Sequence, residues 1–195
     1  MLSNLYDFDI VLASGSPRRR ELLGGLGINF RVACLSDIDE TYPSDLPANM
    51  VAEYLSKKKA EAYRKSLTDK QLIITADTVV ITDRKILGKP ADAADASRML
   101  QALSGAVHQV VTGVTVMSAA KTVSFSATTN VRFATLSDEE IDYYISHYRP
   151  FDKAGAYGIQ GQGALLVAGI HGDYYNVVGL PVARLARQLR DFRLI

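Results

Sequence analysis

The sequence lacks the features that mark secreted and membrane-spanning proteins. It has a single cysteine, Cys34, so no disulfide can form within the chain, which fits a reducing compartment. No apolar run approaches the ~20 residues needed to cross a bilayer. The first ten residues, MLSNLYDFDI, hold two aspartates and no basic segment before an apolar stretch, so we expect no secretory signal. These absences predict a cytoplasmic protein with no membrane partner.

An excess of charge of one sign is also missing. The 22 Lys and Arg residues nearly balance 21 Asp and Glu residues, which leaves a formal net charge of +1. Proteins that bind duplex nucleic acid usually carry a larger basic excess, and no basic stripe interleaved with aromatic residues is present. We therefore expect no nucleic-acid partner. An anionic ligand would be small and would meet a local cluster of cations.

Several catalytic motifs are absent as well. The three histidines, at positions 108, 147 and 171, do not have the spacing of metal ligands. No Cys-x-x-Cys pair and no Gly-x-Ser-x-Gly elbow occurs, which argues against zinc and serine-hydrolase chemistry. No Walker loop is present, so the sequence also lacks the signature of P-loop nucleotide hydrolases.

What the sequence does contain is typical of one soluble α/β domain over residues 1–195, with 48% hydrophobic residues. Adjacent β-rich stretches without a helix between them indicate antiparallel pairing, so the sheet should be mixed. We expect strands at 9–14, 29–35, 72–82, 107–117 and 122–133, helices at 17–27, 50–66, 92–105, 137–148 and 180–192, and a hairpin formed by 164–170 and 174–179.

Two lysines give no clear functional signal by themselves. The helix expected at 50–66 should place five residues on or beside one face: Val51, Tyr54, Leu55, Lys58 and Ala62. Lys59 lies beside that stripe, and a run such as SKKKAEA is more typical of a solvated face. Lys89, in the segment LGKP, is equally ambiguous.

The segment ASGSPRRREL, residues 13–22, places three arginines at the start of a helix. Ser16 as N-cap and Pro17 at the first position explain the helix start without any ligand. Arginines are disfavoured there, because the helix N-terminus carries partial positive charge. An anion held by backbone N–H groups, the hydroxyls of Ser14 and Ser16, and the guanidinium groups would remove the conflict. We therefore favour an anion site, and we expect loss of Arg19 to leave the stability of the ligand-free protein unchanged or slightly higher.

Asp77 lies inside the apolar strand LIITADTVVIT, where Ile73, Thr75, Asp77, Val79 and Ile81 would share one face. An unpaired buried carboxylate is costly, so Asp77 should meet a cation, a metal or water. The alternative is that the strand ends at Ala76 and Asp77 begins a turn, although the β-branched run after it argues against this. We favour a functional carboxylate.

Two loops remain open to two interpretations each. Asp37, Asp39 and Glu40 form an acidic loop that is typical of a surface, but its oxygens could hold magnesium beside a phosphate site. The segment AGAYGIQGQG, at 154–163, contains four glycines that would let backbone approach a ligand or would simply make tight turns.

The motifs LASGSPRRRELL, DTVV, GKP and DKAGAYGIQG resemble, in order and over nearly the whole chain, those of the Maf family. The resemblance implies a long, curved mixed sheet flanked by helices, with two lobes and a cleft between them. It implies hydrolysis of a nucleoside triphosphate to monophosphate and pyrophosphate, with a divalent cation (Mg²⁺ or Mn²⁺). It also implies a homodimer.

The family's functional positions fall on specific residues of this chain. Asp77 matches the family's proton acceptor. Asp77 and Glu40 also match its metal ligands. The loop before Glu40 varies in length, so Asp39 is an alternative to Glu40 at this position. Whether Asp77 is chiefly base or metal ligand stays open. The substrate-binding positions are Ser14, Ser16, Arg18, Arg19, Lys59, Thr78, Lys89 and Gln160.

Three positions resemble the dTTP/UTP branch of the family rather than the 7-methyl-GTP branch. These are Arg18, where the other branch has Trp, Thr78, where it has Gln, and Gln160, where it has Glu. In a regular strand Thr78 would face away from Asp77, so both can serve one site only if the strand bulges or ends there. The open alternatives are the same reaction on 7-methyl-GTP or another modified nucleotide, and a non-catalytic nucleotide-binding regulator of septum formation.

Overall fold

The computed structural model describes residues 2–36 and 38–192. Its strands are β1 (Asp9–Leu12), β2 (Arg31–Val32), β3 (Gln71–Thr82), β4 (Lys85–Leu87), β5 (Val107–Met117), β6 (Thr122–Phe133) and β7 (Val167–His171). Its α-helices are α1 (Pro17–Gly24), α2 (Ala48–Glu61), α3 (Ala93–Leu103), α4 (Asp138–Tyr148), α5 (Tyr174–Val178) and α6 (Val182–Leu189). Short 3₁₀ helices, turns and loops connect these elements.

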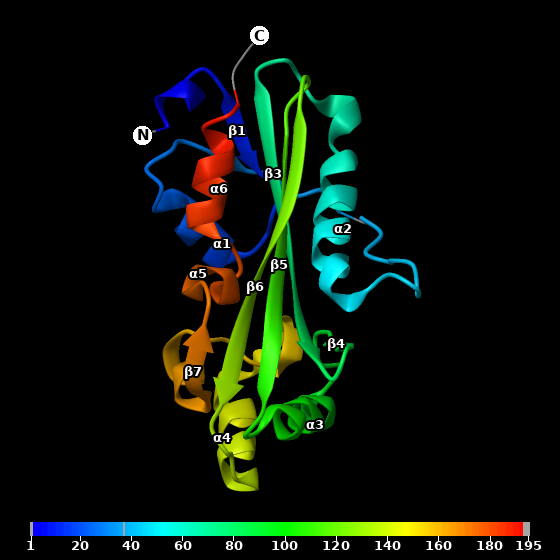
Figure 1. Ribbon diagram of the computed structural model, residues 1–195, viewed down its shortest axis with the longest axis vertical. Coiled ribbons are helices and arrows are strands. Elements are labelled where there is room, and N and C mark those ends of the chain that lie inside the picture. The colour runs from blue at the N-terminus through cyan, green and yellow to red at the C-terminus, as the bar shows by residue number, and fades with distance from the viewer. Residues whose placement is uncertain (1, 37, 193–195) are drawn as a thin grey trace. The chain divides into compact units, whose positions relative to one another are not determined.

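The strands form one mixed sheet in the order β2-β1-β3-β5-β6-β7, with β4 paired to β3 (Figure 1). Strand β1 is parallel to both β2 and β3, whereas the β3–β4 and β6–β7 pairs are antiparallel. The predicted α/β class with a mixed sheet is confirmed.

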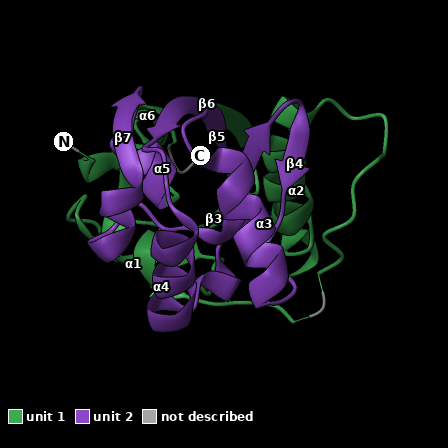
Figure 2. Cartoon of the chain, turned by 90° about the horizontal axis from the view of Figure 1, so that it is seen from below, with its two compact units in different colours: residues 1–77, 112–127, 179–195 green, residues 78–111, 128–178 purple. Residues whose placement is uncertain are grey.

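The chain divides into two compact units, coloured separately in Figure 2. The first unit comprises Met1–Asp77, Thr112–Ala127 and Gly179–Ile195, and the second comprises Thr78–Val111 and Thr128–Val178. Strands β3, β5 and β6 each contribute residues to both units. That residues 1–195 form one domain stays a prediction.

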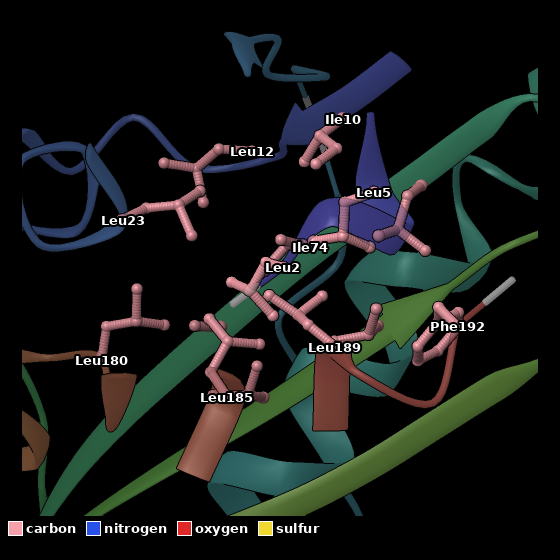
Figure 3. Close-up of a cluster of buried hydrophobic side chains, with 14 of the residues drawn as sticks. Leu2, Leu5, Ile10, Leu12, Leu23, Ile74, Leu180, Leu185, Leu189 and Phe192 are labelled. Atoms are coloured by element: carbon pink, nitrogen blue, oxygen red, sulfur yellow. The ribbon is translucent and has the colours of Figure 1, made fainter. Parts of the chain in front are cut away.

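The first unit buries side chains on both faces of its strands, as the alternation along β1 and β3 requires. Leu12 and Ile74 point to one face, where they pack with Leu23 of α1 and Leu185 of α6 (Figure 3). Val11 and Ile73, which alternate with them along the strands, point to the opposite face, which α2 covers. There they form a second buried cluster with Ala60, Tyr63 and Met117.

The second unit has its own core, in which helices α3 and α4 supply apolar stripes. Helix α4 begins with a capping box, in which Ser137 Oγ accepts from the Glu140 amide and Glu140 Oε2 accepts from the Ser137 amide. The core of this unit contains Val80, Leu100, Leu103, Val110, Val131, Phe133, Ile141 and Tyr157.

The predicted apolar stripe of α2 is confirmed at Val51 and Leu55 and wrong at Tyr54 and Ala62. Tyr54 is exposed, and the buried face holds Val51, Ala52, Leu55, Ser56 and Ala60. The smaller residues on this face let the helix lie close to the sheet, which overrides the preference for burying a larger aromatic ring. In this orientation of the helix about its axis, Lys59 is partly buried instead of lying on the solvated face.

The predicted hairpin at 164–179 is also wrong, because its second arm is helix α5. The first arm, β7, pairs with β6 instead, from Asn130 opposite His171 to Phe133 opposite Val167. The Asn176 side chain donates to the Val110 carbonyl and to Thr129 Oγ1, both at 3.0 Å, and it is fully buried. These tertiary hydrogen bonds override the β propensity of the segment YYNVV.

Candidate active site

The arginine turn is built as its local sequence predicts. Ser16 is the N-cap of α1, its Oγ accepts from the Arg19 amide at 3.4 Å, and Pro17 is the first helical residue. Ser14 is nearly buried, and its Oγ accepts from the Ser16 amide at 3.3 Å. A hydroxyl that accepts from the chain still has its own proton to donate to an anion.

The side chain of Arg19 connects the turn to two distant segments. Its Nε donates to the Gly179 carbonyl at 2.9 Å, and its Nη1 donates to the Ala76 carbonyl at 2.8 Å. Nη1 also lies 3.4 Å from Ser14 Oγ. Because these two carbonyl oxygens stabilise the charge of its guanidinium, Arg19 has a structural role. The sequence did not predict this role.

The surroundings of Arg19 are electrostatically mixed. Burial lowers the pKa of its guanidinium, Arg18 lowers it further, and the negative charges of Asp77 and Glu40 raise it. The turn therefore lies within electrostatic reach of both predicted acids. Arg18 is partly buried in the same first turn of the helix.

Asp77 lies within β3, so the alternative in which the strand ends at Ala76 is wrong. Its Oδ1 is 2.5 Å from Lys59 Nζ, and the two side chains are only 14% and 15% exposed. Thr75, two residues earlier, also contacts α2, through a hydrogen bond to the Ser56 carbonyl. The prediction that Thr75 and Asp77 share one face is confirmed. Of the three kinds of partner expected for Asp77, a cation, a metal or water, the structure shows a cation, Lys59.

The acidic loop contributes Glu40 to the same cluster. Glu40 Oε1 lies 3.0 Å from Lys59 Nζ, so this lysine pairs with both acids. Asp39 pairs instead with Lys58 at 2.7 Å, and hydrogen bonds from Lys58 and Thr41 lower its pKa to about 2. Glu40, and not Asp39, therefore shares Lys59 with Asp77, and the role of either loop acid in metal binding stays a prediction. Asp37 lies outside the described residues.

The cluster in the first unit, which we call the acid–base cluster, contains Ser14, Ser16, Arg18, Arg19, Glu40, Lys59 and Asp77. Within residues 2–36 and 38–192, no three His, Cys, Asp or Glu side chains gather closely enough to hold a metal ion. Two carboxylates that meet at one ammonium group do suit Mg²⁺, which keeps several waters and often takes one or two carboxylates plus substrate phosphates.

The other three predicted substrate-binding residues, Thr78, Lys89 and Gln160, belong to the second unit. In that unit the Gly155 amide donates to the Gly88 carbonyl at 3.0 Å, so the glycine-rich loop contacts the segment that carries Lys89. Gly155 has φ +68°, and a Cβ there would press on Val80. The glycine at this position is explained by a turn and close packing. A role for the three residues in substrate binding stays a prediction.

A buried histidine supports the same loop. His108 Nε2 lies 2.7 Å from the hydroxyl of Tyr157, and both rings pack edge-to-face with Phe133. Burial lowers the pKa of His108 to about 4 and raises the pKa of Tyr157. We missed this residue because a single histidine in a strand has no motif.

Acid should destabilise the protein through His108. In the unfolded chain its pKa is about 6.5, so the folded state binds fewer protons than the unfolded state between about pH 6.5 and pH 4. Above about pH 6.5, His108 is neutral in both states and its protonation does not reduce the free energy of unfolding. As the pH falls from about 6.5 to about 4, the free energy of unfolding should decrease by about 2–3 kcal/mol. Urea unfolding from pH 4 to pH 7 measures it. The variant His108→Gln should show a smaller loss over this window, and equal losses would contradict the assignment.

Comparison with known proteins agrees with the resemblance. A family model described as Maf-like protein matches residues 9–192. A dTTP/UTP pyrophosphatase from Porphyromonas gingivalis is 53% identical over 195 residues, covering 98% of this chain and 98% of the relative. Another from Parabacteroides distasonis is 51% identical over 193 residues, covering 98% of this chain and 100% of the relative.

Among solved structures, a nucleoside-triphosphatase/dITP/XTP pyrophosphatase from Mycobacterium abscessus is 14% identical and has a TM-score of 0.45, covering 94% of this chain and 95% of that chain. The family model spans nearly all of the chain, and the two curated relatives match it along almost their entire length with about half of their residues identical. This chain therefore belongs to the Maf-like protein family.

Proposed function

We propose that this protein hydrolyses dTTP and UTP to the nucleoside monophosphate and pyrophosphate, and so removes these triphosphates from the nucleotide pool. The observation that carries the proposal is the acid–base cluster, in which the Lys59–Asp77 pair and Glu40 lie close to the arginine turn. The names of relatives about half identical to this chain support the same reaction. We propose that the protein acts in the cytoplasm as a homodimer.

The triphosphate is a compact anion that the cations of the cluster would bind. The hydroxyl protons of Ser14 and Ser16 and the N–H groups at the start of α1 would contact phosphate oxygens. Arg18, Arg19 and Lys59 would neutralise the charge that develops on the departing pyrophosphate.

Asp77 would accept the proton of the attacking water. The water oxygen bonds to the α-phosphorus, the bond from that phosphorus to the bridging oxygen breaks, and pyrophosphate leaves with the bonding electrons. Lys59 contacts Oδ1 of Asp77, and a carboxylate has a second oxygen for the proton. Glu40 and Asp77 would also hold Mg²⁺ or Mn²⁺, which when bound supplies neutralisation of the phosphate charge.

The reaction can be tested with the purified protein, Mg²⁺ and a panel of nucleoside triphosphates. We expect pyrophosphate and nucleoside monophosphate as products, and loss of turnover when EDTA removes the metal. Orthophosphate with nucleoside diphosphate as products would contradict the proposed bond cleavage. Nucleotide binding without turnover on any substrate would instead favour the non-catalytic regulator of septum formation.

The base preference is a separate prediction. Gln160 offers both a donor and an acceptor to the edge of uracil or thymine, whereas a glutamate would suit a cationic methylated purine. We expect kcat/KM for dTTP and UTP to exceed that for 7-methyl-GTP about 100-fold or more. Gln160→Glu should narrow this ratio, chiefly through KM. A wild-type preference for 7-methyl-GTP would contradict the prediction.

A further inference from the structure

Hydrogen bonds made by four hydroxyl side chains join helix α2 to three strands of the first unit. They meet the helix at Ser56, one turn before Lys59. Thr75 Oγ1 of β3 donates to the Ser56 carbonyl of α2 at 2.6 Å. Ser56 Oγ lies 2.9 Å from Thr115 Oγ1 of β5, which lies 2.9 Å from Ser124 Oγ of β6. Thr75, Ser56 and Thr115 have no exposed surface. We call these four residues the hydroxyl network.

The direction of each hydrogen bond follows from counting protons. Ser56 Oγ donates its only proton to the Glu53 carbonyl at 2.8 Å, so it must accept from Thr115 Oγ1. Thr115 has then used its proton and must accept from Ser124 Oγ. Each hydroxyl therefore has a defined role, and a fully satisfied buried network of this kind holds its members in one arrangement.

Gly113 of β5 lets the same helix approach the sheet with backbone contact. A Cβ built at Gly113 would overlap the backbone of Ala52 and Glu53, the turn of α2 that precedes Ser56. Any larger side chain would therefore push the helix off the strand or along it. Gly113 and the hydroxyl network together set both the distance and the register of α2 against β3 and β5.

The register matters because the network and the ion pair are successive contacts of one helix–strand pair. Ser56 and Lys59 are three residues apart and share a face of α2, and Thr75 and Asp77 are two residues apart and share a face of β3. The first contact joins Thr75 to Ser56, and the second joins Asp77 to Lys59 at 2.5 Å. A shift of α2 along the strand would move Lys59 Nζ away from Asp77.

We propose that Thr75 and Ser56 are positioning residues that hold Lys59 against Asp77 for the hydrolytic reaction. The inference rests on the proposed function for its kinetic consequence. Neither residue touches the substrate in this account; each acts through the lysine. Because misplacement of a catalytic group by about 1 Å can cost 10²-fold, we expect Thr75→Val to lower kcat/KM about tenfold or more.

The test is a double-mutant cycle between Thr75 and Lys59, measured as kcat/KM for dTTP well below the melting temperature. In the wild-type background, Thr75→Val should cost about tenfold and Thr75→Ser, which keeps the hydroxyl, much less. In a Lys59→Met background, Thr75→Val should cost less than about twofold, because there is no lysine to misplace. An equal loss in both backgrounds, or no loss in the wild type, would overturn the proposal.

Thr129→Val is the matched control for a purely structural effect. Thr129 is another fully buried threonine, and its hydroxyl bonds to Asp173 and Asn176 in the second unit, outside the network. It should lower the melting temperature at least as much as Thr75→Val does, while its effect on kcat/KM stays the same with and without Lys59. If Thr75→Val does not fold, Ser56→Ala replaces it in the same cycle.

A second cycle, with Thr75→Val and Lys59→Met measured as the free energy of unfolding, needs no substrate. The effects of the two substitutions on the free energy of unfolding could be coupled while the wild-type protein hydrolyses no nucleotide. That result would support the placement of Lys59 by Thr75 and reject the proposed function. A wild-type enzyme that releases pyrophosphate, with additive effects in both cycles, would reject the placement and keep the function.

Discussion

Asp77→Asn should lower kcat for dTTP hydrolysis by about 10²–10⁴-fold, the range expected when a positioned base is lost. Asparagine keeps the shape of the side chain, but its amide cannot take a proton from the attacking water. It also cannot neutralise Lys59, whose ammonium would be left with Glu40 as its charged partner at 3.0 Å. Steady-state kinetics of pyrophosphate release measure the effect on turnover.

The same variant should remain folded, with a lower melting temperature, because one partner of a largely buried ion pair is gone. Asp9→Asn is the matched control: Asp9 is another strand aspartate of the first unit, paired with Arg31 at 2.9 Å but half-exposed. It should keep near wild-type turnover. Full activity in folded Asp77→Asn would rule out Asp77 as the base.

Arg19→Ala should weaken triphosphate binding and also lower the free energy of unfolding by about 3 kcal/mol or more. The reason is the pair of hydrogen bonds from its guanidinium to the Gly179 and Ala76 carbonyls, since each hydrogen bond from a charged group contributes about 1.5–3 kcal/mol. This reverses the expectation from the helix dipole alone, which is a gain of a few tenths of a kcal/mol. The Arg19 guanidinium is held by acceptors that the helix itself does not supply.

Arg20→Ala separates the two effects. Arg20 is the next residue of the same helix, shares the unfavourable dipole position and is exposed. Its loss should change the unfolding free energy by no more than about 0.5 kcal/mol. Urea unfolding without ligand and titration calorimetry with a slowly hydrolysed dTTP analogue measure stability and affinity separately. If Arg19→Ala is as stable as Arg20→Ala, Arg19 has no structural role.

The parts of the fold that depend on nearby residues could be predicted from the sequence. The cap at Ser16 and the strand through Asp77 are where the patterns placed them, because hydrogen bonds and alternation act over two to four residues. The second strand, predicted at 29–35, is much shorter, since only Arg31–Val32 pairs with β1. Helix α5 was not predicted because the hydrogen bonds that hold it are not local. The Asn176 side chain donates to residues 66 and 47 positions away along the chain.

The sequence by itself determined the α/β class and the family, because both depend on residue types in order. Through the resemblance it also predicted the acids and cations of the candidate site. Only the tertiary structure decided how they are joined: Lys59 against Asp77, Glu40 rather than Asp39 beside Lys59, and Arg19 on two carbonyls. A buried polar group must find its partner wherever the fold brings one, and for Arg19 the partners lie 57 and 160 residues along the chain. No local pattern contains that information.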